Sequence, residues 1–276
     1  MGGMERQVQV NIPYGMLHES FLNKFLTNRL NPEIGFDAGA LDRFSPEEIN
    51  IIAQKIREAG LTSTMHSPFM DLSPGSPDDE VRALTRKRLE QVVRLIPLFR
   101  PRTVVCHTGY DHKRYWHMRE AWVERSLVTW VWLAQAVHNE GALLMLENVY
   151  ERGPDDMRVF FERLPEDQVG FCLDTGHQNV FSEASMEIWL KSLGAYLKQL
   201  HLHDNRGVND EHLAPGKGQI DFVSLFNQLS SADIRPVVVT LEIHREEDLK
   251  PGLEFLETIW PWSATRNPLG MGGRET

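Results

Sequence analysis

The chain has 276 residues, of which 41% are hydrophobic and 25% charged, and its formal net charge is −10. This composition is typical of a globular protein with enough length for one sizeable core, and it excludes a disordered or fibrous chain. The acidic balance argues against a protein that grips a long stretch of duplex, because such proteins carry a basic face. No apolar run is long enough to span a membrane.

Cysteine usage and the ends of the sequence indicate the compartment. The 2 Cys, Cys106 and Cys172, lie within apolar runs and outside any CxxC pair, so we expect no disulfide framework and a reducing compartment. The start of the sequence lacks the apolar core of a signal peptide, which favours a cytoplasmic protein. Residues 1–7 and 263–276 are expected to be disordered, which leaves residues 8–262 as one domain.

Short apolar and β-branched runs alternate with longer amphipathic stretches along the chain. The predicted strands cover residues 8–12, 33–37, 61–66, 103–107, 143–148, 170–174, 197–203 and 236–243. The predicted helices cover 16–29, 46–60, 78–99, 119–139, 155–163, 184–193, a stretch from 221, and 247–260. The second helix has the clearest signals, because Ser45 is a natural N-cap, Glu48 completes a capping box and Gly60 ends it.

This alternation predicts a parallel sheet of about eight strand–helix units, the number that closes a (β/α)8 barrel. A doubly wound open sheet is the alternative. Such a fold binds its ligand through a glycine-rich first turn, but the sequence NIPYGM after the first strand has no GxGxxG motif. We therefore expect an α/β protein with a single-domain (β/α)8 TIM barrel.

Residues of metal-ligand type stand at the C-terminal ends of the predicted strands, where the active sites of barrels lie. Because side chains alternate faces along a strand, these residues share the inward face, while their neighbours on the other face are mostly aliphatic. The residues are His66, His107, Glu147, Asp174, His201, His203 and Glu242, with His177 just beyond the sixth strand. Asp210 and His212 follow in an unusually long loop after the seventh strand.

Each of these residues alone has an ordinary structural explanation. A histidine near a strand end is usually a hydrogen-bonded structural residue, and the aspartate of LDTG could cap a turn. Six consecutive strands would each need a separate explanation, however, so convergence on one site is the better interpretation. Carboxylates and imidazoles together are ligands for Zn²⁺, Mn²⁺ or Co²⁺. We predict a divalent metal site, with a barrel that senses or stores ions as a non-catalytic alternative.

The motifs MHSPF, VCHTG, LENV, CLDTGH, HLHDN, DEHLAPGKGQIDF and LEI, in this order, resemble the xylose isomerase-like barrel superfamily, which includes sugar-phosphate isomerases and epimerases and the endonuclease IV family. In the isomerase branch, the resemblance implies one Zn²⁺, Mn²⁺, Co²⁺ or Mg²⁺ held by Glu147, Asp174, His201 and Glu242. In the endonuclease branch, it implies three Zn²⁺ that also use His66, His107, His177, Asp210 and His212. All these residues are present, which leaves the branch open.

The first functional expectation is a sugar or sugar-phosphate isomerase or epimerase that transfers a proton through an enediolate. Glu147 and Glu242 would flank a carbohydrate substrate as metal ligands and as the acid/base pair. The side chains expected to orient substrate hydroxyls or a phosphate are those of His203, Arg206, Lys217 and Arg245.

The alternative is a multi-zinc hydrolase of a small phosphodiester or of abasic DNA, although the acidic charge argues against a nucleic acid partner. His177 distinguishes the two functions, since it would bind a second ion in a hydrolase and touch substrate in an isomerase. The tryptophans of WHMREAWVERSLVTWVWL indicate helix packing or the subunit interface of a homo-oligomer.

Overall fold

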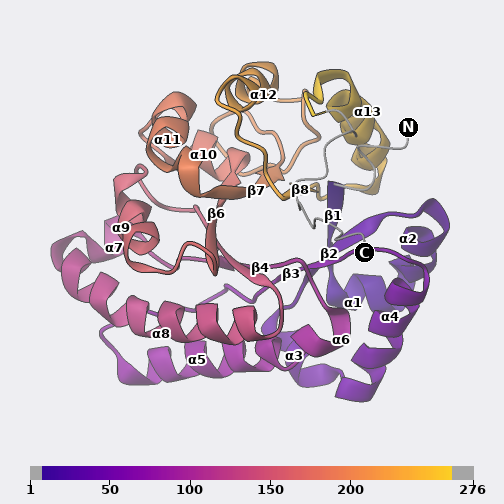
Figure 1. Cartoon of the computed structure of the whole chain (residues 1–276), viewed down its shortest axis with the longest axis horizontal. Coiled ribbons are helices and arrows are strands. Elements are labelled where there is room, and N and C mark those ends of the chain that lie inside the picture. Colours follow the sequence, from indigo (N-terminus) through magenta and orange to yellow (C-terminus); the bar gives the residue numbers. More distant parts are fainter. Residues whose placement is uncertain (1–7, 263–276) are drawn as a thin grey trace, which may run out of the picture.

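The computed structural model describes residues 8–262 and consists of a closed barrel of parallel strands surrounded by helices (Figure 1). Each strand pairs with the next in sequence, and the last strand closes the ring against the first. The strands are β1 (Val8–Pro13), β2 (Asn31–Gly35), β3 (Thr64–His66), β4 (Thr103–His107), β5 (Leu143–Glu147), β6 (Val169–Asp174), β7 (Leu197–Leu202) and β8 (Val238–Leu241). The predicted (β/α)8 barrel is confirmed. The predictions for residues 1–7 and 263–276 lie outside the described residues.

Helices connect the strands and cover the outside of the barrel (Figure 1). The α-helices are α1 (Tyr14–Met16), α2 (Leu22–Asn28), α3 (Ala38–Arg43), α4 (Pro46–Glu58), α5 (Asp79–Val93), α6 (Ile96–Phe99), α7 (His112–Tyr115), α8 (Arg119–Asn139), α9 (Asp155–Arg163), α10 (Thr175–Phe181), α11 (Met186–Leu193), α12 (Phe222–Ser231) and α13 (Leu249–Ile259). A π-helical segment, η1 (Leu17–Phe21), joins α1 to α2, and the 3₁₀ segments are η2 (Trp116–Met118), η3 (Gly194–Tyr196) and η4 (Glu246–Asp248).

The predicted capping box of α4 is confirmed. The Ser45 hydroxyl accepts a hydrogen bond from the Glu48 backbone amide, and the Glu48 carboxylate accepts one from the Ser45 amide at 2.8 Å. The predicted helix 78–99 is divided instead, because Pro97 in α6 has no amide hydrogen with which to continue the ladder of α5.

Three short helices, α3, α7 and α10, were not predicted. Of these, α3 and α10 follow an aspartate at or near the end of a strand, a position that sequence patterns assign to a loop. The Asp37 carboxylate accepts a hydrogen bond from the amide of Ala40 at 2.6 Å, and the Asp174 carboxylate accepts one from the amide of His177 at 2.7 Å. An aspartate in this position satisfies the free amides of the first helical turn. Asp174 is therefore both the end of β6 and the N-cap of α10.

The strand side chains divide between two environments as their alternation predicts. Met65, Leu146 and Leu202 belong to the main apolar core between the strands and the helices. Val105, Met145 and Cys172 form a separate apolar cluster of the inward-facing residues. The buried polar side chains at the strand ends lie on the same inward face, and the strand register brings them together.

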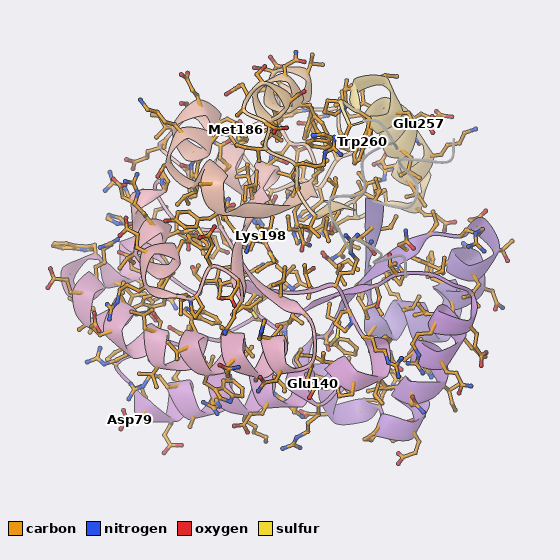
Figure 2. The ribbon with its side chains drawn as sticks, viewed as in Figure 1. Asp79, Glu140, Met186, Lys198, Glu257 and Trp260 are labelled. Atoms are coloured by element: carbon orange, nitrogen blue, oxygen red, sulfur yellow. The ribbon has the colours of Figure 1, made fainter. Side chains whose placement is uncertain are left out.

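The outer surface carries most of the charged residues. Figure 2 shows Asp79 and Glu257 near the edge of the molecule, whereas side chains fill the space between the helices and the barrel. Of the tryptophan stripe, Trp122 and Trp130 are buried in the core, in agreement with helix packing, and Trp116 is exposed. Among residues 8–262 no helix combines the length and the apolar character needed to cross a membrane.

Candidate functional site

The carboxyl ends of the strands bring the predicted ligand residues to one mouth of the barrel. His107 of β4 lies opposite Glu147 of β5 in the strand register, and Asp174 of β6 lies opposite His201 of β7. Neighbouring parallel strands stand about 4.8 Å apart, so paired residues on the same face contact each other. The register itself therefore builds the site.

The first group of possible ligands consists of Glu147, Asp174, His201 and Glu242, whose ligand atoms all lie within 4.8 Å of one another. Nδ1 of His201 lies 2.9 Å from a carboxylate oxygen of Glu242, 3.5 Å from one of Glu147 and 4.0 Å from one of Asp174. Apart from Glu242, which is slightly exposed, these side chains are fully buried. One imidazole nitrogen thus faces three carboxylates.

Glu147 also belongs to a second group, with His66 and His107. Its Oε2 lies 3.1 Å from Nε2 of His66 and 3.6 Å from Nε2 of His107, while its Oε1 faces His201. Nδ1 of His66 lies 2.9 Å from the carbonyl oxygen of Ser67, which holds the ring in place. Glu147 therefore has one carboxylate oxygen directed at each group, the arrangement of a bridging ligand.

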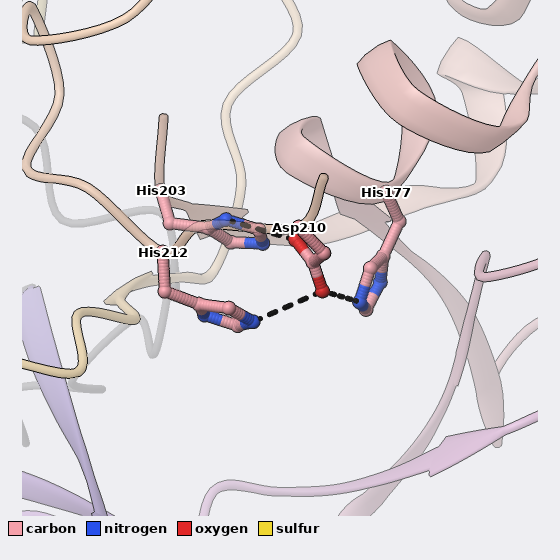
Figure 3. Close-up of side chains that lie close together, drawn as sticks. All are labelled: His177, His203, Asp210 and His212. Atoms are coloured by element: carbon pink, nitrogen blue, oxygen red, sulfur yellow. Dashed lines mark hydrogen bonds and ion pairs between the residues drawn. The ribbon is translucent and has the colours of Figure 1, made fainter. Parts of the chain in front are cut away.

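The third group consists of His177, His203, Asp210 and His212 (Figure 3). Oδ2 of Asp210 lies 3.3 Å from Nε2 of His177 and 3.1 Å from Nε2 of His212. Its other oxygen, Oδ1, lies 3.5 Å from Nδ1 of His203. Three imidazoles from different parts of the chain thus surround one carboxylate.

Two local structures position this third group. The helix α10, capped by Asp174, carries His177 into the mouth, and Asn148 holds Asp174 by hydrogen bonds to both its backbone amide and its carbonyl. The long loop after β7 is fixed by Asp204, whose buried carboxylate accepts hydrogen bonds from four backbone amides, those of Asn205, Gly216, Gly218 and Ile220. This anchored loop carries Asp210 and His212.

Sequence reasoning missed Glu33, a fully buried carboxylate of β2. Its Oε2 accepts hydrogen bonds from Thr64, Gln199 and Thr240, and its Oε1 lies 3.0 Å from Nε2 of His201. A carboxylate on the inward face of a buried strand is the signal that could have revealed it. Glu33 faces the nitrogen of His201 that points away from the first ligand group, the position from which outer carboxylates commonly orient a metal-binding histidine.

The unsatisfied atoms of the site fit divalent ions. Polar atoms buried this deeply are normally hydrogen-bonded. Within residues 8–262, the ligand-group atoms that are buried without a hydrogen-bond partner are Oε1 of Glu147, Nδ1 of His201, Nδ1 of His203, Oδ1 of Asp210 and Oε2 of Glu242. They lie near one another, but their lone pairs are not aligned for hydrogen bonds. A cation among them would satisfy these lone pairs, and the mixed nitrogen and oxygen donors suit Zn²⁺, Mn²⁺ or Co²⁺.

The pKa values follow from burial and from this crowding. Burial raises the pKa of Glu147, but the neighbouring histidines outweigh this effect and hold it well below its ordinary value. Burial lowers the pKa of His107 to about 3. Burial lowers the pKa of His212, but the Asp210 hydrogen bond and the nearby carboxylates together outweigh burial and raise this pKa to about 9.

Of the predicted substrate-binding residues, three cations form ion pairs with neighbouring carboxylates and His203 lies within the third ligand group. Arg206 pairs with Glu211, Lys217 with Asp248, and Arg245 with Glu247. His203 is fully buried within the third group. Arg206, Lys217 and Arg245 thus form ion pairs with acidic residues of the long loop and of the segment after β8.

An open pocket of about 680 Å³ lies over the ligand groups. Its walls include His107, His177, Asp210, His212 and Glu242, together with the aromatic side chains of Phe69, Tyr110, Tyr115, Tyr150 and Phe181. Arg114, which sequence reasoning did not select, also lines the pocket, and its side chain is 71% exposed. The pocket therefore combines ligand residues, aromatic walls and one exposed cation.

Comparisons with known proteins agree with this fold. A family model described as "xylose isomerase-like TIM barrel" matches residues 32–259. The structure of a Thermus thermophilus protein, TTHB071, soaked with ZnCl₂, has a TM-score of 0.77 and 26% identity, and covers 92% of this chain and 98% of that one. A D-tagatose 3-epimerase-like protein has a TM-score of 0.75 and 21% identity, with 92% and 96% covered.

A curated relative, the "probable endonuclease 4" of Mycobacterium ulcerans, is 24% identical over 209 residues, which are 71% of this chain and 80% of that protein. The family model matches most of the chain, and the closed barrel agrees with it. This protein belongs to the xylose isomerase-like TIM barrel family.

Proposed function

We propose that this protein is a metal-dependent hydrolase of small phosphodiesters, which uses more than one divalent ion at the mouth of the barrel. The observation that carries the proposal is the position of Glu147, whose two oxygens face two different ligand groups. A third group adjoins them through Asp174, which lies 3.0 Å from His203. A multi-ion centre suits phosphodiester hydrolysis, and the curated relatives of this chain include probable endonucleases.

Divalent ions, when bound, would neutralise charge on the phosphate and activate water at neutral pH. The residues that would hold these ions are Glu147, which lies between two ligand groups, His66 and His107 on one side of it, and Asp174, whose backbone Asn148 fixes by two hydrogen bonds. Arg114, exposed at the rim of the pocket and 3.9 Å from Asp111, would offer its guanidinium group to a phosphate oxygen of the substrate.

The acidic net charge of −10 and the pocket of about 680 Å³ favour a small substrate over a long duplex. The aromatic walls would contact the less polar part of such a molecule. The substrate class proposed is therefore a small organic phosphodiester.

A sugar isomerase or epimerase is the second candidate. It is favoured by the first ligand group, which offers a complete one-ion site with Glu147 and Glu242, and by solved structures of similar fold that include sugar epimerases. Against it, Oε2 of Glu147 is within hydrogen-bond distance of His66 and its Oε1 faces His201, so histidines of two ligand groups surround the carboxylate that would have to reach a substrate carbon. The geometry thus favours the hydrolase.

Metal content tests the proposal. Protein purified without chelators and freed of loose metal should contain more than one Zn²⁺, Mn²⁺ or Co²⁺ per chain, measured by elemental mass spectrometry. The variants His66→Ala and His212→Ala should each lose one ion. His138→Ala, which changes an exposed histidine of α8, is the matched control and should keep the full content.

Activity assays then separate the two candidates. The loaded protein should hydrolyse bis(p-nitrophenyl) phosphate, and chelation should abolish this hydrolysis. A panel of ketohexoses and ketopentoses, analysed by chromatography, tests the second candidate. One ion per chain together with sugar epimerisation would overturn the hydrolase proposal.

A further inference from the structure

We propose that His203 is a fourth protein ligand of the ion held by His177, Asp210 and His212, and that its second ring nitrogen connects this ion to Asp174. This inference rests on the proposed function only in requiring a divalent ion at the third group. The sequence suggested that His203, a buried residue directly after β7, contacts substrate. The inference makes it a metal ligand instead.

The three imidazoles of the group share one pattern of contacts. Each has one ring nitrogen directed outward: Nδ1 of His177 lies 3.0 Å from the carbonyl oxygen of Asn148, and Nδ1 of His212 lies 3.1 Å from that of Glu242. Nε2 of His203 lies 3.0 Å from a carboxylate oxygen of Asp174. Metal-binding histidines typically donate their other N–H to such an acceptor, which sets the tautomer of the ring.

The remaining nitrogen of each ring faces Asp210 (Figure 3). If Nε2 of the neutral His203 ring donates its hydrogen to Asp174, then Nδ1 carries a lone pair. This Nδ1 lies 3.5 Å from Oδ1 of Asp210, and neither atom has a hydrogen-bond partner within the described part of the chain. Two buried acceptors that face each other repel, so a cation bound between them would account for the short separation of Nδ1 of His203 and Oδ1 of Asp210.

The packing of the His203 ring against α10 requires a residue without a side chain at position 176. A Cβ placed on Gly176 would lie 1.9 Å from the His203 ring, so no other residue fits at this position of α10 without moving the ring. On its other face the ring stacks on His212 at 3.8 Å between centroids. His203 is fully buried and held on both faces, as a ligand side chain must be.

The same contacts link two of the ligand groups. His203 touches Asp174, a member of the first group, through Nε2 and faces Asp210, a member of the third, through Nδ1. Removal of the imidazole should therefore weaken the third group most, and should also loosen the Asp174 carboxylate in the first.

The test compares metal binding in His203→Asn with that in His244→Asn. His244 stacks on the far side of His212 at 3.8 Å, but it belongs to none of the ligand groups, so it is a control in the same row of rings. In titrations with Co²⁺, His203→Asn should lower the affinity for one ion by at least about tenfold and weaken the visible absorption of the four-ligand site. His244→Asn should leave both unchanged.

The unaltered protein offers a second measurement, which does not depend on how well the variant folds. In long-range ¹H–¹⁵N spectra of histidine rings, Zn²⁺ should shift the Nδ1 resonance of His203 as strongly as the Nε2 resonances of His177 and His212. If His212→Asn loses an ion while His203→Asn keeps it, and the His203 resonance does not move, His203 is only a hydrogen-bond donor to Asp174 and the inference is wrong. If the wild-type protein binds no ion at the third group, the proposed function fails with it.

Discussion

At the scale of single residues, the site consists of buried carboxylates in close contact with histidines. Glu33 is the clearest case, since its carboxylate accepts three hydrogen bonds and faces His201 without being near the pocket surface. Its charge favours the imidazole orientation in which Nδ1 points at Glu147 and Glu242. Glu33 thus acts on the site through His201.

The variant Glu33→Gln tests this role. It keeps the shape of the side chain but removes the charge, and we expect the affinity of the first ligand group for Zn²⁺ to fall by about 10- to 100-fold. Competition titrations with a chromophoric chelator measure the change. Glu151→Gln, a change at another buried carboxylate outside the ligand groups, is the control, and an equal loss in both variants would contradict the role of Glu33.

Glu151 itself predicts a pH dependence of stability. Burial raises the pKa of Glu151 from its ordinary value of 4.5 to about 7, although the hydrogen bond from Thr108 opposes this. The folded chain therefore holds a proton that the unfolded chain releases between these pH values, and stability falls as the pH rises through this window. The difference amounts to about 3 kcal/mol.

Urea unfolding at several pH values between 4.5 and 7 measures this effect. The free energy of unfolding of the wild-type protein should decline more steeply with pH than that of Glu151→Gln, which cannot titrate. Parallel curves for the two proteins would show that Glu151 ionises normally in the folded state.

At the scale of elements, the site depends on α10 and on the loop after β7, neither of which is a regular part of the barrel. Asp174 is the last residue of β6 and the N-cap of α10, and it also belongs to the first ligand group. We therefore expect substitutions in the first turn of α10 to disturb the site, because any shift of the backbone there moves both Asp174 and His177.

Gly176→Ala is the sharpest test of that turn. The added methyl group would overlap the His203 ring, and we expect a destabilisation of about 1–3 kcal/mol together with weaker metal binding at the third group. Gly15→Ala is the matched control, because a Cβ at that helical position meets no atom of residues 8–262 within 4 Å. Thermal unfolding and metal titration of both variants decide, and similar behaviour of the two would contradict the close packing of α10 on His203.

At the scale of the whole molecule, the barrel concentrates charge in its interior. Glu33, Glu147, Asp174 and Glu242 lie buried or nearly so in the barrel, and the histidines between them reduce their mutual repulsion. Bound cations would stabilise the folded chain, because they bind to it and not to the unfolded chain.

Metal removal should therefore lower the stability of the entire barrel. An ion present at 100 times its dissociation constant contributes about 2.7 kcal/mol, which for a chain of this size corresponds to a change in Tm of roughly 5 to 10 °C. Calorimetry before and after dialysis against EDTA measures the change, and added Zn²⁺ should reverse it. An unchanged Tm would mean that the carboxylates and histidines compensate one another without an ion.

The parallel barrel and most of its site could be predicted because strand alternation and strand ends are local properties. The positions of His66, His107, Glu147 and Asp174 at the ends of apolar runs suffice to put their side chains at one mouth, once the strands close into a ring. The cations Arg206, Lys217 and Arg245 could not be placed in this way, since their orientation depends on acidic partners from the long loop and from the segment after β8.

The sequence by itself determined the order of strands and helices, the inward face of each strand and the types of ligand at the barrel mouth, because period and spacing act over a few residues. Only the tertiary structure decided how these ligands are grouped. The position of Glu147 between two ligand groups, the contact of Glu33 with His201 and the orientation of His203 depend on contacts between residues far apart in the chain. His177 illustrates the difference: its presence after β6 was evident from the sequence, but its place beside Asp210 follows from the folding of a distant loop.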